Sequence, residues 1–386
     1  MKTVYVDNNA TTRVDQQVID EMMPCFTEYY GNPSSMHRKG GEAGNILKLA
    51  RERVAKTLNA QPDEILFTSC GTESNNSAIR AALKAQPAKK HIVTTMVEHP
   101  AVKSLCESLD KEGYRTTYLP VDGKGRLNMA AFEASLTPDT AIVSVMWANN
   151  ETGTIFPIRD IARRVKEKGI LFHTDAVQAV GKIPVDAQDI PFDMLSLSGH
   201  KLHAPKGVGA LYVRSGFKFN PFLIGGHQES GKRGGTENIG SIVALGKACE
   251  LALDHMDEEN VRVKQLRDKL EAGLLARIPK CFVNGDTANR LPNTSSISFE
   301  FIEGEAILLM MNEFGICASS GSACTSGSLE PSHVLRAMGI PFTAAHGTIR
   351  FSLCRYNTED EVDYIIEKLP AVIKRLRDMS PFWKED

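Results

Sequence analysis

The residues that could do chemistry lie in polar loops that follow apolar, strand-like runs. One such loop is Ser196-Leu197-Ser198-Gly199-His200-Lys201, in which a lysine comes among hydroxyls and an imidazole. Desolvation and nearby positive charge can lower the pKa of a lysine amine far enough for nucleophilic or Schiff-base chemistry. The alternative is an ordinary solvated loop lysine, and this loop alone does not decide between the two interpretations.

Two other loops supply a carboxylate and a candidate phosphate site. Asp175 comes directly after the apolar run that ends in Phe172-His173-Thr174, where it could pair with a protonated heterocyclic nitrogen or only cap a helix. The segment 68–73 joins a strand to a helix, and backbone N–H groups at a helix N-terminus bind phosphate. Lysine, acid and phosphate cradle in one α/β domain together favour a pyridoxal phosphate enzyme.

Nucleotide and metal motifs are weak by comparison. The glycine spacing of 226–232 resembles a P-loop, but Arg233 stands where Ser or Thr should hold magnesium. The eight cysteines are scattered singly with no Cys-x-x-Cys pair, so neither a structural zinc site nor a disulfide framework is expected. We therefore expect no metal.

Short β-branched runs that alternate with helical segments must position these loops. Such alternation with fully apolar strands predicts a mainly parallel sheet covered on both faces, which binds ligands at the carboxyl ends of its strands. Seven strands are predicted, at Ile65–Phe67, His91–Thr95, Thr116–Leu119, Ala141–Met146, Ile170–His173, Met194–Leu197 and Val208–Val213. The predicted helices are Glu73–Lys84, Ala101–Lys111, Met129–Ser135 and Ile158–Lys168.

The pattern changes after about residue 255. Charged helices and a few strands then suggest a smaller α+β domain. Its predicted helices are Asp257–Leu275, Glu305–Asn312 and Glu359–Arg377, and its predicted strands are Ser295–Phe299 and Thr348–Leu353. We expect a large domain over 13–256 and a small one over 257–386, the latter joined by 1–12 with its strand Thr3–Val6.

Composition excludes several classes of protein. The 386 residues carry a net charge of −2, which gives no basic footprint for nucleic acid or an anionic membrane. No uncharged apolar run approaches the ~18 residues of a membrane span, and Asp7 interrupts any signal-like start. The sequence therefore predicts a soluble cytoplasmic protein.

Longer motifs make the sequence similar to a known family. It resembles the class V, fold-type I pyridoxal phosphate enzymes and, among them, the cysteine desulfurases, most closely the nitrogen-fixation (NifS) type. The motifs run nearly end to end: Asp7–Thr12, Gly31–Ser35, Glu98-His99-Pro100, Asn149–Gly153, His173–Gln178, Ser198–Lys201, Arg233–Asn238, Ser319–Cys324 and His346–Ser352. The resemblance implies an α/β fold with a large, mainly parallel seven-stranded sheet and a smaller C-terminal domain.

The resemblance also implies roles for individual residues. Lys201 would hold the cofactor covalently, and His99 would stack on its ring and assist proton transfer. The remaining cofactor contacts would be Asp175 at the ring nitrogen, Gln178 at the ring hydroxyl, Gly71, Thr72, Ser198 and His200 at the phosphate, and Asn150. Asn150 and Arg350 would bind the substrate carboxylate, since a guanidinium fork matches a carboxylate bidentately. Thr236 would reach the phosphate of a neighbouring subunit, which implies a homodimer.

Cys324 is the cysteine expected to react. It lies in the Gly/Ser stretch 319–328, whose small residues cannot build a packed core and leave the backbone wide freedom. Cys317 lies in an apolar run and is expected in the core. The expected reaction converts L-cysteine to L-alanine, leaves a persulfide on Cys324 and passes the sulfur to an iron–sulfur scaffold protein, with nitrogenase as a destination. Alternatives are a selenocysteine lyase, a class V aminotransferase or a non-catalytic sulfur-relay scaffold.

Overall fold

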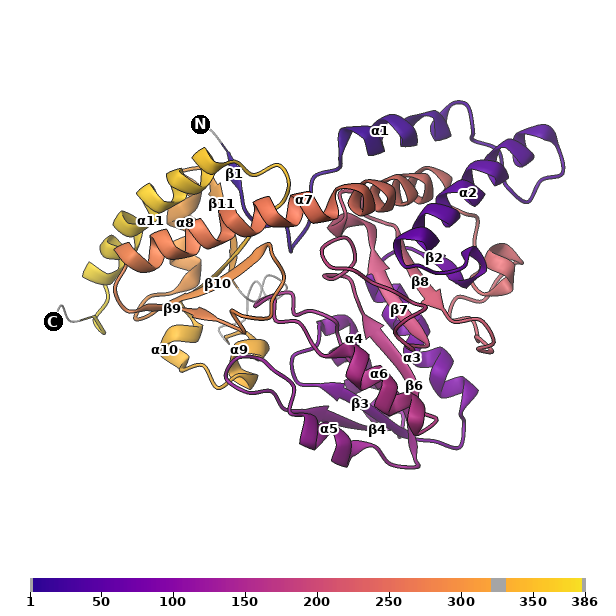
Figure 1. The fold of residues 1–386 in the computed structure, drawn as a ribbon, viewed down its shortest axis with the longest axis horizontal. Helices are drawn as coiled ribbons and strands as arrows, with labels where there is room; N and C mark the ends of the chain where they lie inside the picture. The colour runs from indigo at the N-terminus through magenta and orange to yellow at the C-terminus, as the bar shows by residue number, and fades with distance from the viewer. Residues whose placement is uncertain (1–2, 321–330, 384–386) are drawn as a thin grey trace.

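The computed structural model describes residues 3–320 and 331–383. Its larger part is built on a sheet of seven strands in the order β2-β8-β7-β6-β5-β3-β4 (Figure 1). These strands are β2 (Ile65–Thr68), β3 (His91–Thr95), β4 (Arg115–Leu119), β5 (Thr140–Ser144), β6 (Leu171–Asp175), β7 (Met194–Ser198) and β8 (Gly209–Val213). Only β8 runs antiparallel to its neighbours, so the predicted mainly parallel sheet is confirmed.

Helices cover both faces of this sheet, and strands β2, β3, β5, β7 and β8 are buried along their whole length. One face packs against α3 (Gly71–Ala85) and α4 (Pro100–Lys111). The other face packs against α1, α2, α5, α6 and α7. Their bounds are Gln16–Met22, Arg38–Thr57, Met129–Ser135, Ile158–Glu167 and Ile239–Arg277.

A second core lies around an antiparallel sheet in the order β12-β13-β10-β9. The elements of this C-terminal part are β9 (Cys281–Asn284), β10 (Thr294–Phe299), α8 (Gly304–Glu313), β11 (Ile316–Cys317), β12 (Ser319–Ser320), α9 (His333–Ala337), α10 (Phe342–Ala345), β13 (Thr348–Ser352) and α11 (Glu359–Asp378). The N-terminal strand β1 (Val4–Tyr5) pairs with β11, so the start of the chain packs with its end. The division into domains at 256/257 stays a prediction, and that position falls inside the long helix α7.

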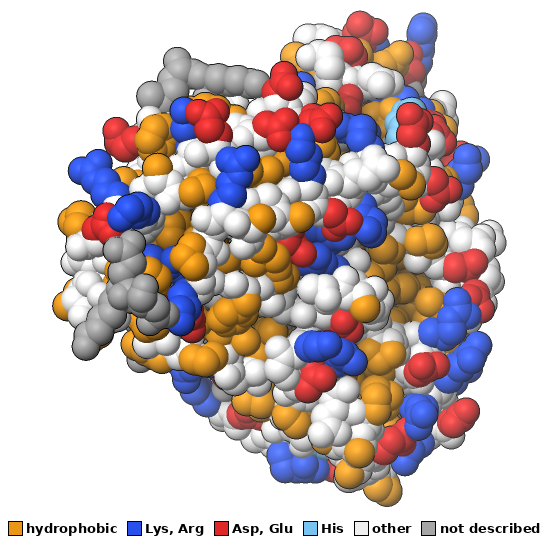
Figure 2. Space-filling view, turned by 60° about the vertical axis from the view of Figure 1, so that its left-hand side comes forward, with side chains coloured by type: hydrophobic (Ala, Val, Ile, Leu, Met, Phe, Trp, Pro, Cys, Tyr) orange, Lys and Arg blue, Asp and Glu red, His pale blue; other side chains and the backbone are white. Residues whose placement is uncertain are grey.

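Among the described residues no helix is long and apolar enough to cross a membrane. On the face drawn in Figure 2, acidic and basic side chains are interspersed around hydrophobic ones. This surface agrees with the near-zero net charge and offers no large field of one sign on the face in view.

Candidate active site

A cavity of about 380 Å³ opens at the carboxyl ends of the parallel strands. Strands β6 and β7 end in Asp175 and Ser198, and the N-termini of α3 and α4 lie at the same edge. Ten of the predicted site residues line this one cavity: Gly71, Thr72, His99, Asn150, Asp175, Gln178, Ser198, His200, Lys201 and Arg350. The structure therefore brings together residues that lie up to about 280 positions apart in the sequence.

Lys201 ends a short 3-10 helix that follows β7. Its Nζ donates to the backbone carbonyls of Asn9 (2.5 Å) and Ala10 (2.7 Å). Two residues before Lys201, position 199 has room only for glycine, since a Cβ there would lie 2.8 Å from Val208 Cγ1. The tight turn and the N-terminal segment together place the amine in the cavity.

Asp175 is buried, with 6% of its surface exposed. Its Oδ1 accepts from the backbone N–H of Val177 at 3.0 Å, and its Oδ2 accepts from Nδ2 of Asn75 at 2.6 Å. These two donors fix the direction of the carboxylate in the cavity that Lys201 also lines. A carboxylate in this position suits a protonated heterocyclic nitrogen.

Gly71, Thr72, Ser198 and His200, which the sequence predicts to hold a phosphate, line the same cavity. A Cβ at Gly71 would lie 2.9 Å from Val177 Cγ2, so the N-terminus of α3 can approach Val177 this closely only with a glycine. Ser198 Oγ is buried and has no hydrogen-bond partner among the described residues. An unpaired hydroxyl beside a helix N-terminus matches a phosphate oxygen, so these residues fit pyridoxal phosphate.

Two imidazoles line the same cavity. Burial lowers the pKa of His200 to about 4, and the charge of Lys201 adds to this effect. Burial also lowers the pKa of His99, which Asp175 opposes and Lys201 reinforces. Nδ1 of His99 accepts from the backbone N–H of Ala101 at 3.1 Å. A neutral His99 ring therefore carries its proton on Nε2, the other ring nitrogen.

Gln178 is held from both ends of its amide. Its Nε2 donates to the carbonyl of Asn9 at 3.1 Å, and its Oε1 accepts from Lys182 Nζ at 3.2 Å. Burial lowers the pKa of Lys182 to about 8, against the opposing charge of Glu259. Sequence reasoning assigned no function to Lys182, although it fixes the orientation of a predicted cofactor ligand.

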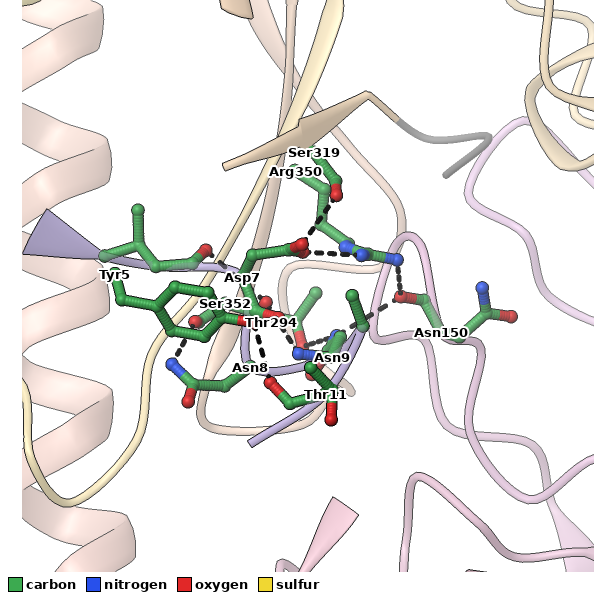
Figure 3. A network of polar contacts seen from close by, with 12 residues as sticks. Tyr5, Asp7, Asn8, Asn9, Thr11, Asn150, Thr294, Ser319, Arg350 and Ser352 are labelled. Atoms are coloured by element: carbon green, nitrogen blue, oxygen red, sulfur yellow. Dashed lines mark hydrogen bonds and ion pairs between the residues drawn. The ribbon is translucent and has the colours of Figure 1, made fainter. Parts of the chain in front are cut away.

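Arg350 lies on β13 with only 2% of its surface exposed (Figure 3). Its guanidinium donates to Asp7 Oδ1 at 2.8 Å and to the backbone carbonyl of Asn150 at 3.0 Å. Ser319 Oγ donates to the other oxygen of Asp7 at 2.8 Å. The side chain of Asn150 points away from Arg350 in Figure 3, so the two residues meet through the main chain of Asn150.

Asn9 contacts cavity residues from both the large sheet and the C-terminal part, although the sequence predicted no role for it. Its carbonyl accepts from Lys201 and Gln178, and its Nδ2 donates to Thr294 Oγ1 (2.8 Å) and to the carbonyl of Asn150 (3.2 Å). The motif 7–12 was visible in the sequence, but a backbone acceptor has no residue signature of its own.

Three further cavity residues were also missed. Asn75 comes from the second turn of α3, and His333 begins α9. Glu151 is buried next to Ser332 Oγ (2.5 Å), and burial raises the pKa of its carboxyl to about 7. Glu151 lies within the motif Asn149–Gly153, whereas Asn75 and His333 lie outside the motifs and gave no signal in the sequence.

Among the described residues, one predicted site residue does not line this cavity. Thr236 lines a separate cavity of about 210 Å³ together with Arg233. Cys324 lies outside the described residues. Cys317 is only partly buried, on β11, and Cys70 lines the main cavity as the N-cap residue of α3. Within 3–320 and 331–383 no group of His, Cys, Asp and Glu side chains could hold a metal ion.

Known proteins are similar to this chain in sequence and in fold. The model of the class V aminotransferase family matches residues 4–365. The cysteine desulfurase NifS of Azotobacter vinelandii is 62% identical over 384 residues, which cover 99% of this chain and 96% of that protein. A cysteine desulfurase of Trichormus azollae is 61% identical over 386 residues, covering 100% of this chain and 96% of its own length.

Solved structures of similar proteins have the same fold. A NifS-like protein superposes with a TM-score of 0.92 at 42% identity, covering 97% of this chain and 100% of that one. SspA in complex with cysteine superposes with a TM-score of 0.82 at 37% identity, covering 92% and 100%. The chain belongs to the class V aminotransferase family and, within it, to the pyridoxal phosphate-dependent cysteine desulfurases of the NifS type.

Proposed function

We propose that this cysteine desulfurase moves the sulfur of L-cysteine onto Cys324, releases L-alanine and hands the sulfur to an iron–sulfur scaffold protein in the cytoplasm for nitrogenase assembly. The observation that carries the proposal is the meeting of Lys201, Asp175 and Arg350 in one cavity. An amine, a buried carboxylate and a guanidinium are the groups needed to handle an amino acid on this cofactor.

The proposed roles follow from the contacts of each residue. Pyridoxal phosphate, when bound, supplies an electron sink that acidifies the α-proton of an amino acid. Asp175 keeps the ring nitrogen protonated and Gln178 faces the ring hydroxyl. Gly71, Thr72, Ser198 and His200 hold the phosphate through donors at a helix N-terminus.

The substrate is oriented by its carboxylate. Arg350 turns its guanidinium toward that group, beside the loop of Asn150. The amine of Lys201 then takes the proton from Cα, and Nε2–H of His99 supplies a proton to the substrate. Exclusion of water by the buried walls strengthens these charge interactions.

The sulfur step requires a thiolate. Sγ of Cys324 attacks the substrate sulfur, the Cβ–S bond breaks, and its electron pair stays on Cβ, which takes up a proton. The proton that Lys201 removed then returns to Cα. Cysteine and a thiol thus become alanine and a persulfide, with no external oxidant. Three other thiols suit this step poorly, because burial raises the pKa of Cys106 and Cys249 to about 12 and that of Cys354 to about 11.

A product assay separates this function from its alternatives. With L-cysteine and a reducing thiol, the purified protein should form alanine and sulfide in equal amounts. Formation of 3-mercaptopyruvate that depends on a keto acid would indicate transamination, and absence of any product would indicate a scaffold. A selenocysteine lyase would turn over selenocysteine while leaving cysteine untouched.

We further propose a homodimer in which Thr236 serves the cofactor of the partner subunit. In its own protomer Thr236 lies in a cavity apart from Lys201, which supports this placement. Co-expressed Lys201→Ala and Thr236→Ala chains test it at limiting cofactor. A shared site restores one intact site per mixed dimer, so activity should return; if Thr236 acts within its own protomer, the mixture stays as inactive as its components.

A further inference from the structure

Asn75 is a fully buried amide in the wall of the active-site cavity. It has 1% of its surface exposed and comes from the second turn of α3, the helix whose N-terminus forms part of the phosphate cradle. Its Nδ2 donates to Asp175 Oδ2 at 2.6 Å, a short contact of the kind that ionised acceptors make. One helix therefore touches both the phosphate side and the ring-nitrogen side of the cavity.

The other end of the amide has no comparable contact. Oδ1 of Asn75 is buried and has no hydrogen-bond partner among the described residues. Buried amides usually satisfy both ends. The orientation of this amide is therefore set by Asp175, and exchanging its oxygen and nitrogen would put two oxygens 2.6 Å apart.

We propose that Asn75 is a positioning residue that keeps the carboxylate of Asp175 aimed at the ring nitrogen of pyridoxal phosphate. This inference rests on the proposed role of Asp175. Val177 N–H occupies Oδ1 of the carboxylate, and Asn75 occupies Oδ2. Without the amide, Oδ2 loses this donor and the carboxylate can rotate, so it no longer holds the proton on the ring nitrogen.

The test uses cofactor labelled with ¹⁵N at the ring nitrogen, whose NMR shift reports directly whether that atom carries a proton. Asn75→Leu should move the signal toward the unprotonated position and weaken cofactor binding about tenfold or more, as expected for a lost hydrogen bond to a charged group. Asn75→Ala, which suits a helix well, should act in the same direction and covers the case in which leucine prevents folding.

The neighbouring amide provides a matched control. Among the residues that the structure describes, Asn76 Nδ2 donates only to the backbone carbonyl of Thr72 in the same helix, at 3.0 Å, and Asn76 does not line the cavity. Asn76→Leu should keep the protonated signal and the cofactor affinity. The proposal is overturned if Asn75→Leu and Asn75→Ala also keep both.

A double substitution separates this inference from the role of Asp175. Asp175→Asn should itself shift the ¹⁵N signal, and adding Asn75→Leu should then change little, because the amide acts through the carboxylate. If Asp175→Asn leaves the signal unchanged, the proposed role of Asp175 fails. If it shifts the signal but Asn75→Leu adds its full effect on top, Asn75 acts independently and the positioning role is wrong.

Discussion

Replacing Arg350 by lysine should weaken the binding of cysteine more than it slows the later steps. Lysine keeps the positive charge but loses the planar fork. In the structure the guanidinium already donates to Asp7 Oδ1 and to the carbonyl of Asn150. Only 2% of the surface of Arg350 is exposed. A single ammonium drawn to Asp7 cannot also provide a parallel pair of donors for a carboxylate.

The size of the effect follows from one lost charge-assisted contact. Hydrogen bonds to charged groups contribute roughly 1.5–3 kcal/mol, which corresponds to about one to two decades in affinity. We therefore expect the KM for cysteine to rise about 10- to 100-fold in the Arg350→Lys variant, with a smaller change in kcat. Steady-state kinetics at saturating cofactor measure both.

A second buried arginine controls for the general cost of the substitution. Arg267 on α7 is also 2% exposed and donates to the carbonyl of Leu291 and to Asp268, away from the cavity. Arg267→Lys should destabilise the fold yet leave KM unchanged. If Arg350→Lys likewise leaves KM unchanged, the carboxylate is bound elsewhere and the reasoning fails.

Three other predictions concern lysines and pH. Borohydride reduction and peptide mapping should label Lys201, and label on Lys182 or Lys206 would refute its role. Lys182→Met should weaken cofactor binding by releasing Oε1 of Gln178, and unchanged affinity would show that this contact is dispensable. Burial lowers the pKa of His173 to about 3 in the folded chain, whereas the unfolded chain binds this proton below a pH of about 6.5. His173 should therefore lower the free energy of unfolding by about 1.4 kcal/mol per unit as pH drops through that window. His173→Gln should remove this contribution from the pH dependence of urea midpoints, and an unchanged dependence would refute the assignment.

The large sheet was predictable because its strands are short β-branched runs bounded by turn residues. All seven predicted strands are present, with ends shifted by at most two residues. Helix α2 was not predicted, and its glycines, such as Gly40 and Gly44, are poor helix formers. Helix α2 packs closely against α7: a Cβ on Gly246 of α7 would lie 2.7 Å from Cα of Ala50 in α2.

The first half of α7 was missed for a related reason. The predicted helix began at Asp257, but the structure begins it at Ile239, after the cap residue Asn238. Residues 242–252 are buried except for Lys247 and Glu250, so only two side chains are left to mark a polar face and a helical period. Near-complete burial weakened the signal on which such a prediction depends.

The site was predictable where side chains follow strands. Lys201 and Asp175 stood out by position, and parallel topology implied that they would meet. Arg350 came only from the family resemblance, because its strand lies in the antiparallel part. Asn75 and the carbonyl of Asn9 gave no signal, since a helical amide and a backbone oxygen look ordinary in a sequence.

Mass spectrometry of the protein after incubation with cysteine shows whether Cys324 receives the sulfur. Alkylation and digestion should show one extra sulfur atom on the peptide that carries Cys324. Cys324→Ser should keep the yellow cofactor but form almost no alanine or sulfide, whereas Cys70→Ser, at the cavity wall, and Cys317→Ala should form both. An extra sulfur on the Cys70 peptide, or near wild-type turnover by Cys324→Ser, would contradict the account.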